Sequence, residues 1–249
     1  MELYNEDCLD RLPLIADKSI DCIIADLPYG SSEMKWDQII PMDKLWKEFN
    51  RICKDNAAIV MFGSQPFTSI LVNSNIKNFK HEWIWKKDKG ANFAHVKRAP
   101  MKEHENIVVF GTGRAPTRYF PQKQEREGNG KNLIGTKYVA NLGAKSESIS
   151  GPRMKEREGR VSELRYPSSV QYFNRQTGLH PTQKPLQLLN YLVLTYSESG
   201  DTILDPSMGS GTTGVAAAEL GRNFIGIELD GEIFNKAKER IEKYAVYGS

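Results

Sequence analysis

A glycine-rich turn in the last fifth of the chain has the residue types of a nucleoside-binding site. Gly209, Gly211 and Gly214 follow the spacing G-x-G-x-x-G and stand between an apolar run and a helical pattern. Glycines at this spacing allow a tight turn and a close approach of the backbone to a ligand. The strand expected next ends at Glu228, whose carboxylate can bind a ribose diol. Together these features predict a nucleoside cofactor.

The residue before this turn indicates which nucleoside it binds. Asp205 stands just ahead of the glycines, where its carboxylate would repel a pyrophosphate. The same carboxylate suits a cationic ligand, such as the amino group and sulfonium of S-adenosylmethionine. A hydride-transferring enzyme commonly opens its cofactor domain with such a turn, whereas only one strand and one helix are expected after this one. The pattern therefore favours S-adenosylmethionine over a dinucleotide.

A second polar group follows an apolar run near the N-terminus. Asp26, Leu27, Pro28 and Tyr29 come directly after residues 21–25, which have the composition of a buried strand. In a doubly wound sheet, ligands bind at the carboxyl ends of the strands, so Asp26 and Tyr29 are candidate site residues. A strand followed by an ordinary proline turn gives the same pattern, and the tetrapeptide alone does not decide between the two.

The elements that must position these residues alternate between strand and helix. The expected strands cover residues 21–25, 57–62, 106–110, 202–204 and 224–227. The expected helices cover residues 43–53, 67–72, a stretch from Leu186, a stretch ending near Leu220 and a closing stretch ending near Tyr247. This alternation predicts an α/β fold with a doubly wound, mostly parallel sheet. The C-terminal strands cannot close a core alone, so they must lie beside the N-terminal strands and bring Asp26 close to Gly209.

Residues 111–178 interrupt this alternation. They contain 13 Lys and Arg against 6 Asp and Glu, while the whole chain has a net charge of +3. A basic segment on a mildly acidic body suggests that a polyanion is held on one side. A segment of this length with few apolar residues is usually functional or partly disordered, and charge alone would favour a solvated loop.

Composition narrows the class of protein. No stretch approaches the ~20 apolar residues of a membrane helix, and the N-terminus lacks a signal-peptide pattern. The three cysteines form no C-x-x-C pair, so we expect reduced thiols in a cytoplasmic protein. The four histidines show no metal-ligand spacing, and no metal site is expected.

Several motifs, taken in order, resemble those of the amino-directed DNA methyltransferases of the N6-adenine/N4-cytosine family, in the permuted β-type arrangement. The family's (D/N/S)-P-P-(Y/F/W) matches residues 26–29, with Leu27 in place of the first proline. Its D-P-x-x-G-S-G-T-T matches residues 205–213, and its H-P-T-x-K-P matches residues 180–185. Residues 6–9 resemble its G-D-C-L. The resemblance covers roughly residues 1–110 and 180–249 but not the segment between them.

The resemblance implies a circularly permuted methyltransferase domain in three parts. Residues 1–110 would be its catalytic half, 111–178 a target-recognition insert and 179–249 its cofactor-binding half. The implied reaction is methyl transfer from S-adenosylmethionine to N6 of adenine in DNA. N4-cytosine methylation is the nearest alternative, and Asp26 in place of serine favours adenine. An RNA or protein substrate, or a nucleoside-binding protein or subunit without catalysis, are more distant alternatives.

Roles for individual residues follow from the same resemblance. Asp26 and the Leu27 carbonyl would accept hydrogen bonds from the target amine, beside Pro28, and Tyr29 would stack on a base that has left the duplex. The cofactor contacts would be Asp7, Cys8, Asp26, Lys184, Asp205, Gly209, Ser210, Gly211, Thr212 and Glu228. The DNA contacts would be Lys35, Arg153, Lys155, Arg157, Arg160 and Arg165. Lys184 would face the methionine carboxylate. Lys35 would belong either to a lid over the site or to a segment that anchors a loop. A homodimer is compatible with this group of methyltransferases.

Overall fold

The computed structural model describes residues 1–30, 38–93, 96–125, 164–176 and 183–245. Some predictions lie outside these ranges. Among them are the expected DNA contacts Lys35, Arg153, Lys155, Arg157 and Arg160 and the motif residues His180, Pro181 and Thr182.

The described residues form one main sheet of eight strands. Its order is β1 (Glu2–Asn5), β10 (Asn223–Glu228), β9 (Thr202–Asp205), β2 (Ile20–Ala25), β3 (Cys53–Gly63), β5 (Lys102–Gly111), β4 (Phe79–Ala91) and β8 (Val170–Tyr172). Only β5 runs against its neighbours; the other pairings are parallel. The predicted mostly parallel sheet is confirmed, and β9 pairs with β2, so the C-terminal strands do lie among the N-terminal ones.

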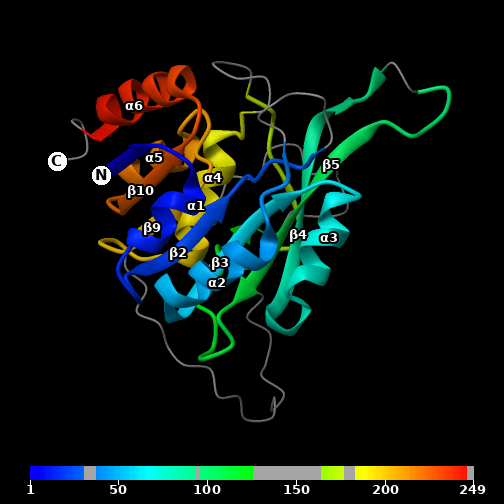
Figure 1. Ribbon diagram of the computed structural model, residues 1–249. Coiled ribbons are helices and arrows are strands. Elements are labelled where there is room, and N and C mark those ends of the chain that lie inside the picture. Colours follow the sequence, from blue (N-terminus) through cyan, green and yellow to red (C-terminus); the bar gives the residue numbers. More distant parts are fainter. Residues whose placement is uncertain (31–37, 94–95, 126–163, 177–182, 246–249) are drawn as a thin grey trace, which may run out of the picture.

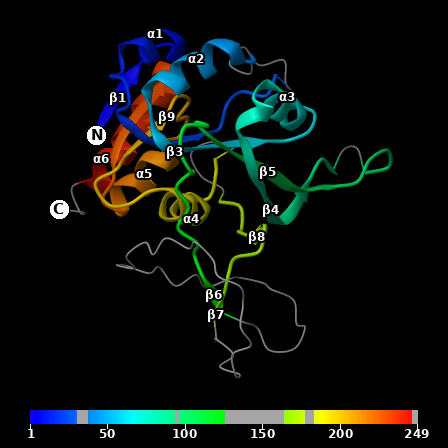
Figure 2. The same cartoon turned by 90° about the horizontal axis from the view of Figure 1, so that it is seen from below.

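Helices cover both faces of this sheet (Figures 1 and 2). On one face lie α1 (Cys8–Arg11), α2 (Met42–Ile52) and α3 (Phe67–Ser74); on the other lie α4 (Leu186–Tyr196), α5 (Thr212–Glu219) and α6 (Gly231–Ala245). Successive side chains of β2 serve both faces, since Ile23 packs in the core under α2 while Ile24 packs in the core under α4. Every residue of β2 is buried, as expected for a central strand.

Helix α2 forms because its apolar residues recur at helical spacing. Leu45, Trp46, Phe49 and Ile52 are buried on one face, which confirms the helix predicted over residues 43–53 to within a residue at each end. The Trp46 indole packs edge-on against Phe110 of β5, with ring centroids 4.9 Å apart. This packing holds α2 against β5 on that face of the sheet.

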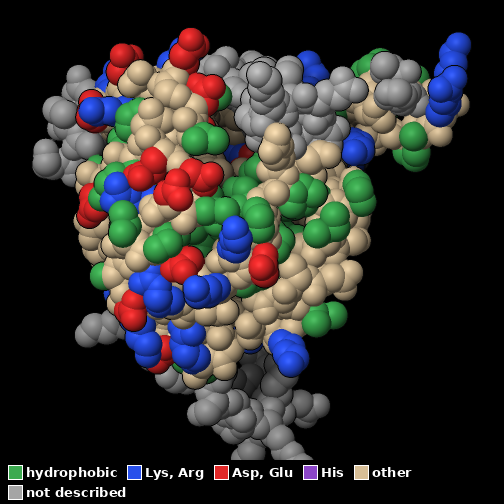
Figure 3. Space-filling model, viewed as in Figure 1, with side chains coloured by type: hydrophobic (Ala, Val, Ile, Leu, Met, Phe, Trp, Pro, Cys, Tyr) green, Lys and Arg blue, Asp and Glu red, His purple; other side chains and the backbone are tan. Residues whose placement is uncertain are grey.

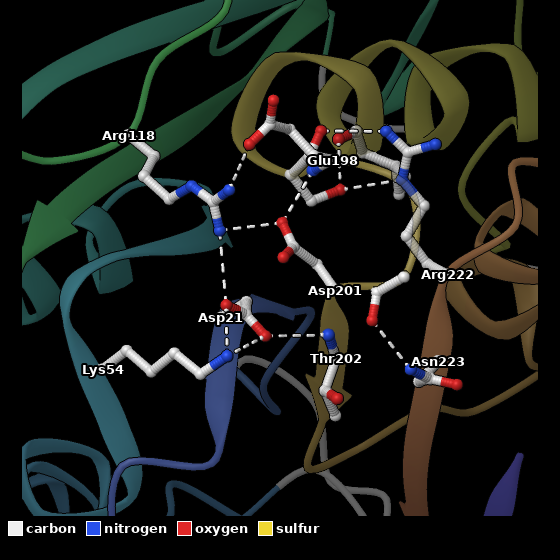
Figure 4. A network of polar contacts seen from close by, with 11 residues as sticks. Asp21, Lys54, Arg118, Glu198, Asp201, Thr202, Arg222 and Asn223 are labelled. Atoms are coloured by element: carbon white, nitrogen blue, oxygen red, sulfur yellow. Dashed lines mark hydrogen bonds and ion pairs between the residues drawn. The ribbon is translucent and has the colours of Figure 1, made fainter.

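A polar network ties the strands together at the sheet edge where β2 begins (Figure 4). The buried carboxylate of Asp21 accepts hydrogen bonds from Lys54 Nζ at 2.7 and 2.8 Å, from Arg118 at 3.2 Å and from the Thr202 amide at 3.0 Å. Arg118 also pairs with Asp201 at 2.8 Å, and with Glu198. The network joins β2, β3, β9 and the segment that follows β5.

Both described ends of residues 111–178 belong to the folded body. β8 extends the main sheet beside β4, and β6 (Gln124–Glu125) pairs with β7 (Leu164–Arg165) in a separate two-stranded sheet. The buried amides of Gln124 and Gln171 hydrogen bond to each other at 2.7 Å. These strands were not predicted from the sequence, because the segment has few apolar residues and side-chain amides take part of the buried space there. No helix among the described residues is long and apolar enough to span a membrane.

Candidate active site

A cleft of about 960 Å³ opens at the carboxyl ends of β2, β9 and β10. It brings together most of the site residues predicted from the sequence. Those that line it are Asp7, Cys8, Asp26, Leu27, Pro28, Tyr29, Lys184, Asp205, Gly209, Ser210, Thr212 and Glu228. Gly211 is not among its lining residues, and Arg165 lies away from it in β7.

The glycine turn has the backbone conformation that the sequence predicts. Gly209 and Gly211 have φ angles of +51° and +73°, in the left-handed region that favours glycine. A Cβ atom on Gly209 would meet nothing within 4 Å, so the backbone there borders open space. A Cβ on Gly211 would lie 2.9 Å from Ile241 Cδ1, which shows that Gly211 allows α6 to pack closely. Gly209 therefore shapes the cleft and Gly211 supports it.

Glu228 is held in place at the end of β10. Its Oε2 atom accepts a hydrogen bond from the Gly209 amide at 2.9 Å, and its Oε1 atom accepts one from the Asp230 amide at 2.9 Å. The carboxylate thus joins the glycine turn to the next strand end. This position fits the role of a ribose-binding acid.

Asp205 is a buried carboxyl group at the end of β9. It accepts hydrogen bonds from the Ser207 amide at 3.1 Å and from Thr213 Oγ1 at 2.7 Å. Burial raises the pKa of Asp205 to about 7, and these hydrogen bonds only partly offset it. The nearby carboxylates of Asp26 and Glu228 raise this pKa further. A cationic ligand in the cleft would stabilise the ionised form, so the site fits a group that carries positive charge.

Asp26 has partners on each side of its carboxylate. Tyr29 Oη donates to Oδ1 at 2.9 Å, and Lys184 Nζ donates to Oδ2 at 2.5 Å. The Tyr29 ring stacks on Phe67 of α3, with centroids 4.9 Å apart and planes inclined by 20°. These contacts fix the carboxylate and the aromatic ring relative to each other at the mouth of the cleft.

Glu105 of β5 is a functional candidate that sequence reasoning missed. Its carboxylate lies between two lysines: Oε2 is 3.5 Å from Lys184 Nζ, and Oε1 contacts Lys87 Nζ. Burial opposes the charge of Glu105, but Lys184 and Lys87 outweigh it and hold its pKa below the usual value. Burial likewise opposes the charge of Lys184, but Asp26 and Glu105 raise its pKa overall. A chain of alternating charges, buried at Lys184 and half-buried at the other members, therefore runs from Lys87 to Asp26.

Smaller contacts complete the cleft. Asp7 caps α1 by accepting a hydrogen bond from the Leu9 amide at 2.8 Å. Burial raises the pKa of the neighbouring Cys8 thiol to about 12, so this thiol stays protonated and is a poor nucleophile. Arg240 of α6, also missed from the sequence, donates to Ser210 O and to Thr212 Oγ1, each at 3.0 Å.

Comparisons with known proteins identify the family. A family model described as DNA methylase, for N6 and N4 enzymes, matches residues 20–239. The chain is 31% identical to the type II methyltransferase M2.LlaDCHI of Lactococcus lactis subsp. cremoris, over 99% of this chain and 91% of the relative. It is 30% identical to the type II methyltransferase M2.DpnII of Streptococcus pneumoniae, over 97% and 90%.

Two solved structures share the fold. The complex of M1.HpyAVI with SAM matches with a TM-score of 0.62 and 21% identity, over 96% of this chain and 98% of that one. The cytosine-N4-specific PvuII DNA methyltransferase matches with a TM-score of 0.66 and 13% identity, over 99% and 91%.

Proposed function

The chain belongs to the N6/N4 DNA methylase family, and from this we propose that it transfers a methyl group from S-adenosylmethionine to N6 of adenine in DNA. The observation that carries the proposal is the meeting of Asp26 with the glycine turn. Ser207 Oγ donates to the Asp26 backbone carbonyl at 3.1 Å, and both residues line one cleft. A group bound on the turn and a base held by Asp26 would therefore be neighbours.

The residues of the turn fit the cofactor. Glu228 would bind the ribose, Asp205 would face the positive charge, and Asp7, Cys8, Ser210 and Thr212 would complete the pocket. Lys184 would bind the methionine carboxylate in place of, or together with, Asp26. When bound, S-adenosylmethionine supplies an activated methyl group.

The residues after β2 would position the target amine. The lone pair of an exocyclic amine is delocalised into the base, so the amine is a poor nucleophile. Asp26 and the Leu27 carbonyl would accept hydrogen bonds from its N–H groups and direct its lone pair at the methyl group, so that much of the rate comes from positioning. Tyr29, held by Phe67, would stack on the extruded base. No covalent intermediate with the protein is needed, in keeping with the protonated Cys8.

The larger division of the chain is part of this proposal. Residues 1–110 would form the catalytic half, 111–178 the target-recognition insert and 179–249 the cofactor-binding half of a permuted domain. Arg165, which lies in β7 of that insert, would contact a phosphate, and the same role is proposed for Lys35, Arg153, Lys155, Arg157 and Arg160. The enzyme would act on DNA in the cytoplasm. Sedimentation analysis would test whether it forms the homodimer that the family resemblance allows.

One assay tests the reaction and the base together. The protein is incubated with radiolabelled S-adenosylmethionine and unmethylated genomic DNA, and the DNA is digested to nucleosides. We expect label in N6-methyladenine. Label in N4-methylcytosine instead would keep the site chemistry and overturn the choice of base. Unlabelled DNA, under conditions in which the cofactor binds, would contradict a DNA methylase acting alone.

A further inference from the structure

Strands β4 and β5 form a hairpin that projects from the body of the molecule (Figures 1 and 2). Trp85 pairs with Glu105 at its base, and Ala91 pairs with Lys102 farther out, with an irregularity between Lys86 and Ala91. The described part of the tip continues through Phe93 on one side and from Val96 on the other. Among the described residues, no helix or strand covers the outer hairpin, so burial in a core does not explain which side chains it has.

The charge of the outer hairpin is largely uncompensated. Its acidic residues are already engaged: Asp88 accepts from the Arg175 amide at 2.9 Å, and Glu103 pairs with Lys86 at 3.3 Å. Four exposed cations form no ion pair with any residue that the structure describes. They are Lys89, Lys97, Arg98 and Lys102. Figure 3 shows Lys and Arg side chains at the far end of the hairpin, away from the acidic side chains on the body.

Large apolar side chains are exposed among these cations. Phe93 is 74% exposed, Val96 45% and Met101 38%. Cations beside an exposed aromatic ring are the combination that binds nucleic acid, since cations neutralise phosphates and rings stack on bases.

The position of the hairpin relates it to the cleft. Glu105 at its base lies 3.5 Å from Lys184, which contacts Asp26. Phe93 lies eight positions after Trp85 in the chain. At about 3.3 Å per residue the tip lies at most roughly 25 Å from the base. The major groove, about 12 Å wide, admits a two-stranded ribbon, so a hairpin of this length can lie along DNA whose target base enters the cleft.

We propose that the β4–β5 hairpin is a DNA-binding ribbon that enters a groove beside the target base. Lys89, Lys97, Arg98 and Lys102 contact phosphates, and Phe93 packs against the bases. This inference rests on the proposed function, because it assumes a DNA substrate for the Asp26 cleft. It assigns DNA contact to a surface outside the 111–178 segment.

Salt-dependent binding tests the cations. Affinity for a fluorescent duplex is measured by anisotropy between low and physiological salt, for the wild type and for K97A/R98A. Each phosphate contact contributes about 0.9 to the slope of log affinity against log salt, so the double variant should lower the slope by about 1.8. Cofactor affinity should not change. The matched control is K236A/K243A, which removes the same charge from exposed positions of α6 and should leave the slope unaltered.

A second pair of variants tests the ring. Phe93→Ala should raise the KM for DNA several-fold, because the apolar contact of the ring with base edges in the groove is lost, while Phe93→Tyr should retain activity. Because Phe93 is exposed, neither change should alter the melting temperature. If the wild type binds DNA and neither K97A/R98A nor Phe93→Ala weakens binding, the hairpin inference is wrong and the methylase proposal stands. If the wild type binds no DNA, both are wrong.

Discussion

Lys184 Nζ lies 2.5 Å from Asp26 Oδ2, although the two residues are 158 positions apart in the chain. One comes from the loop that precedes α4 and the other from the residue after β2, so only the folded sheet brings them together. The contact places a cation against one oxygen of the carboxylate while Tyr29 holds the other. The carboxylate is thereby oriented by a contact on each of its oxygens.

Asp26→Asn should abolish most methyl transfer. The substitution keeps the size of the side chain but exchanges one acceptor oxygen for a donor, which would face the hydrogens of the target amine. We expect kcat to fall on the order of 10²–10³-fold, as when one group that stabilises developing charge is removed. The affinity for the cofactor, measured by calorimetry, should change only a few fold. A variant with near-normal kcat would exclude Asp26 as the acceptor.

Glu105→Gln should slow the reaction without preventing folding. Removal of this charge leaves Lys87 and Lys184 with one carboxylate fewer, and Lys184 then has Asp26 as its remaining anionic partner. Since Glu105 helps raise the pKa of Lys184, the basic limb of the kcat–pH profile should move to lower pH. We expect kcat to fall about tenfold, which corresponds to an activation free energy higher by roughly 1.4 kcal/mol. The KM for DNA should change less.

Glu103→Gln is the matched control for this prediction. Glu103 lies two residues away on β5, and its one ion pair among the described residues is with the partly exposed Lys86, at 3.3 Å. Its loss should leave both kcat and the pH profile unaltered. Equal effects of the two variants would show that general strand stability, and not the chain of charges, is responsible.

Cofactor binding should depend on pH through Asp205. Its pKa of about 7 lies above the usual value because the group is buried. The carboxyl is therefore protonated below pH 7 and ionised above it, and only the ionised form attracts a cation. Affinity should weaken as pH falls from 7 to 5.5, approaching tenfold per pH unit, and level off above pH 8.

Calorimetry with Asp205→Asn checks the assignment. The asparagine does not titrate, so the variant should bind weakly at every pH, with a flat profile. A wild-type profile that is flat from pH 5.5 to 8 would refute the role of Asp205. A sloping profile in the variant would assign the titration to another group.

Asp21→Ala should destabilise the protein without touching the cleft. The change leaves Arg118 and the Thr202 amide without a buried acceptor, at the edge of the sheet opposite the carboxyl ends. Loss of one partner from a buried ionic network costs about 3–5 kcal/mol. Because Arg118 keeps Asp201 and Glu198, the lower end of that range is expected.

The variant for comparison is Lys54→Ala, and the free energy of unfolding of both variants is measured by chemical denaturation. The Lys54 side chain is 45% exposed, so its ion pair with Asp21 should contribute less than about 1 kcal/mol. Similar losses for Asp21→Ala and Lys54→Ala would mean that Arg118 and Thr202 do not depend on Asp21.

Local pattern was enough to predict the elements that bury apolar side chains at regular spacing. The predicted strands over residues 21–25, 57–62 and 106–110 correspond to β2, β3 and β5, whose apolar side chains are buried. The four-residue strand β1 was missed, because so short a segment carries almost no periodicity.

The site was predictable only where a motif is contiguous. Asp26 and Gly209 stand in such motifs, and both line the cleft. Glu105 carries no local signal, since its partners Lys87 and Lys184 lie 18 and 79 positions from it and their proximity arises from strand pairing and the placement of α4. Arg240 reaches Ser210 and Thr212 from α6 and was hidden for the same reason. The role proposed for the outer part of the β4–β5 hairpin likewise could not be predicted from the sequence, because it depends on the position of the hairpin beside the cleft.

The place of β9 between β10 and β2 has a consequence for biosynthesis. Until Thr202–Asp205 has left the ribosome, one edge of β2 has no partner, and at about 5–20 residues per second this lasts on the order of ten to thirty seconds. An unpaired strand in which Asp21 is the one charged residue among apolar ones is a template for aggregation. Translation thus exposes a vulnerable intermediate, and the nascent chain gains its methylating centre only after the last strands insert into the middle of a sheet begun much earlier.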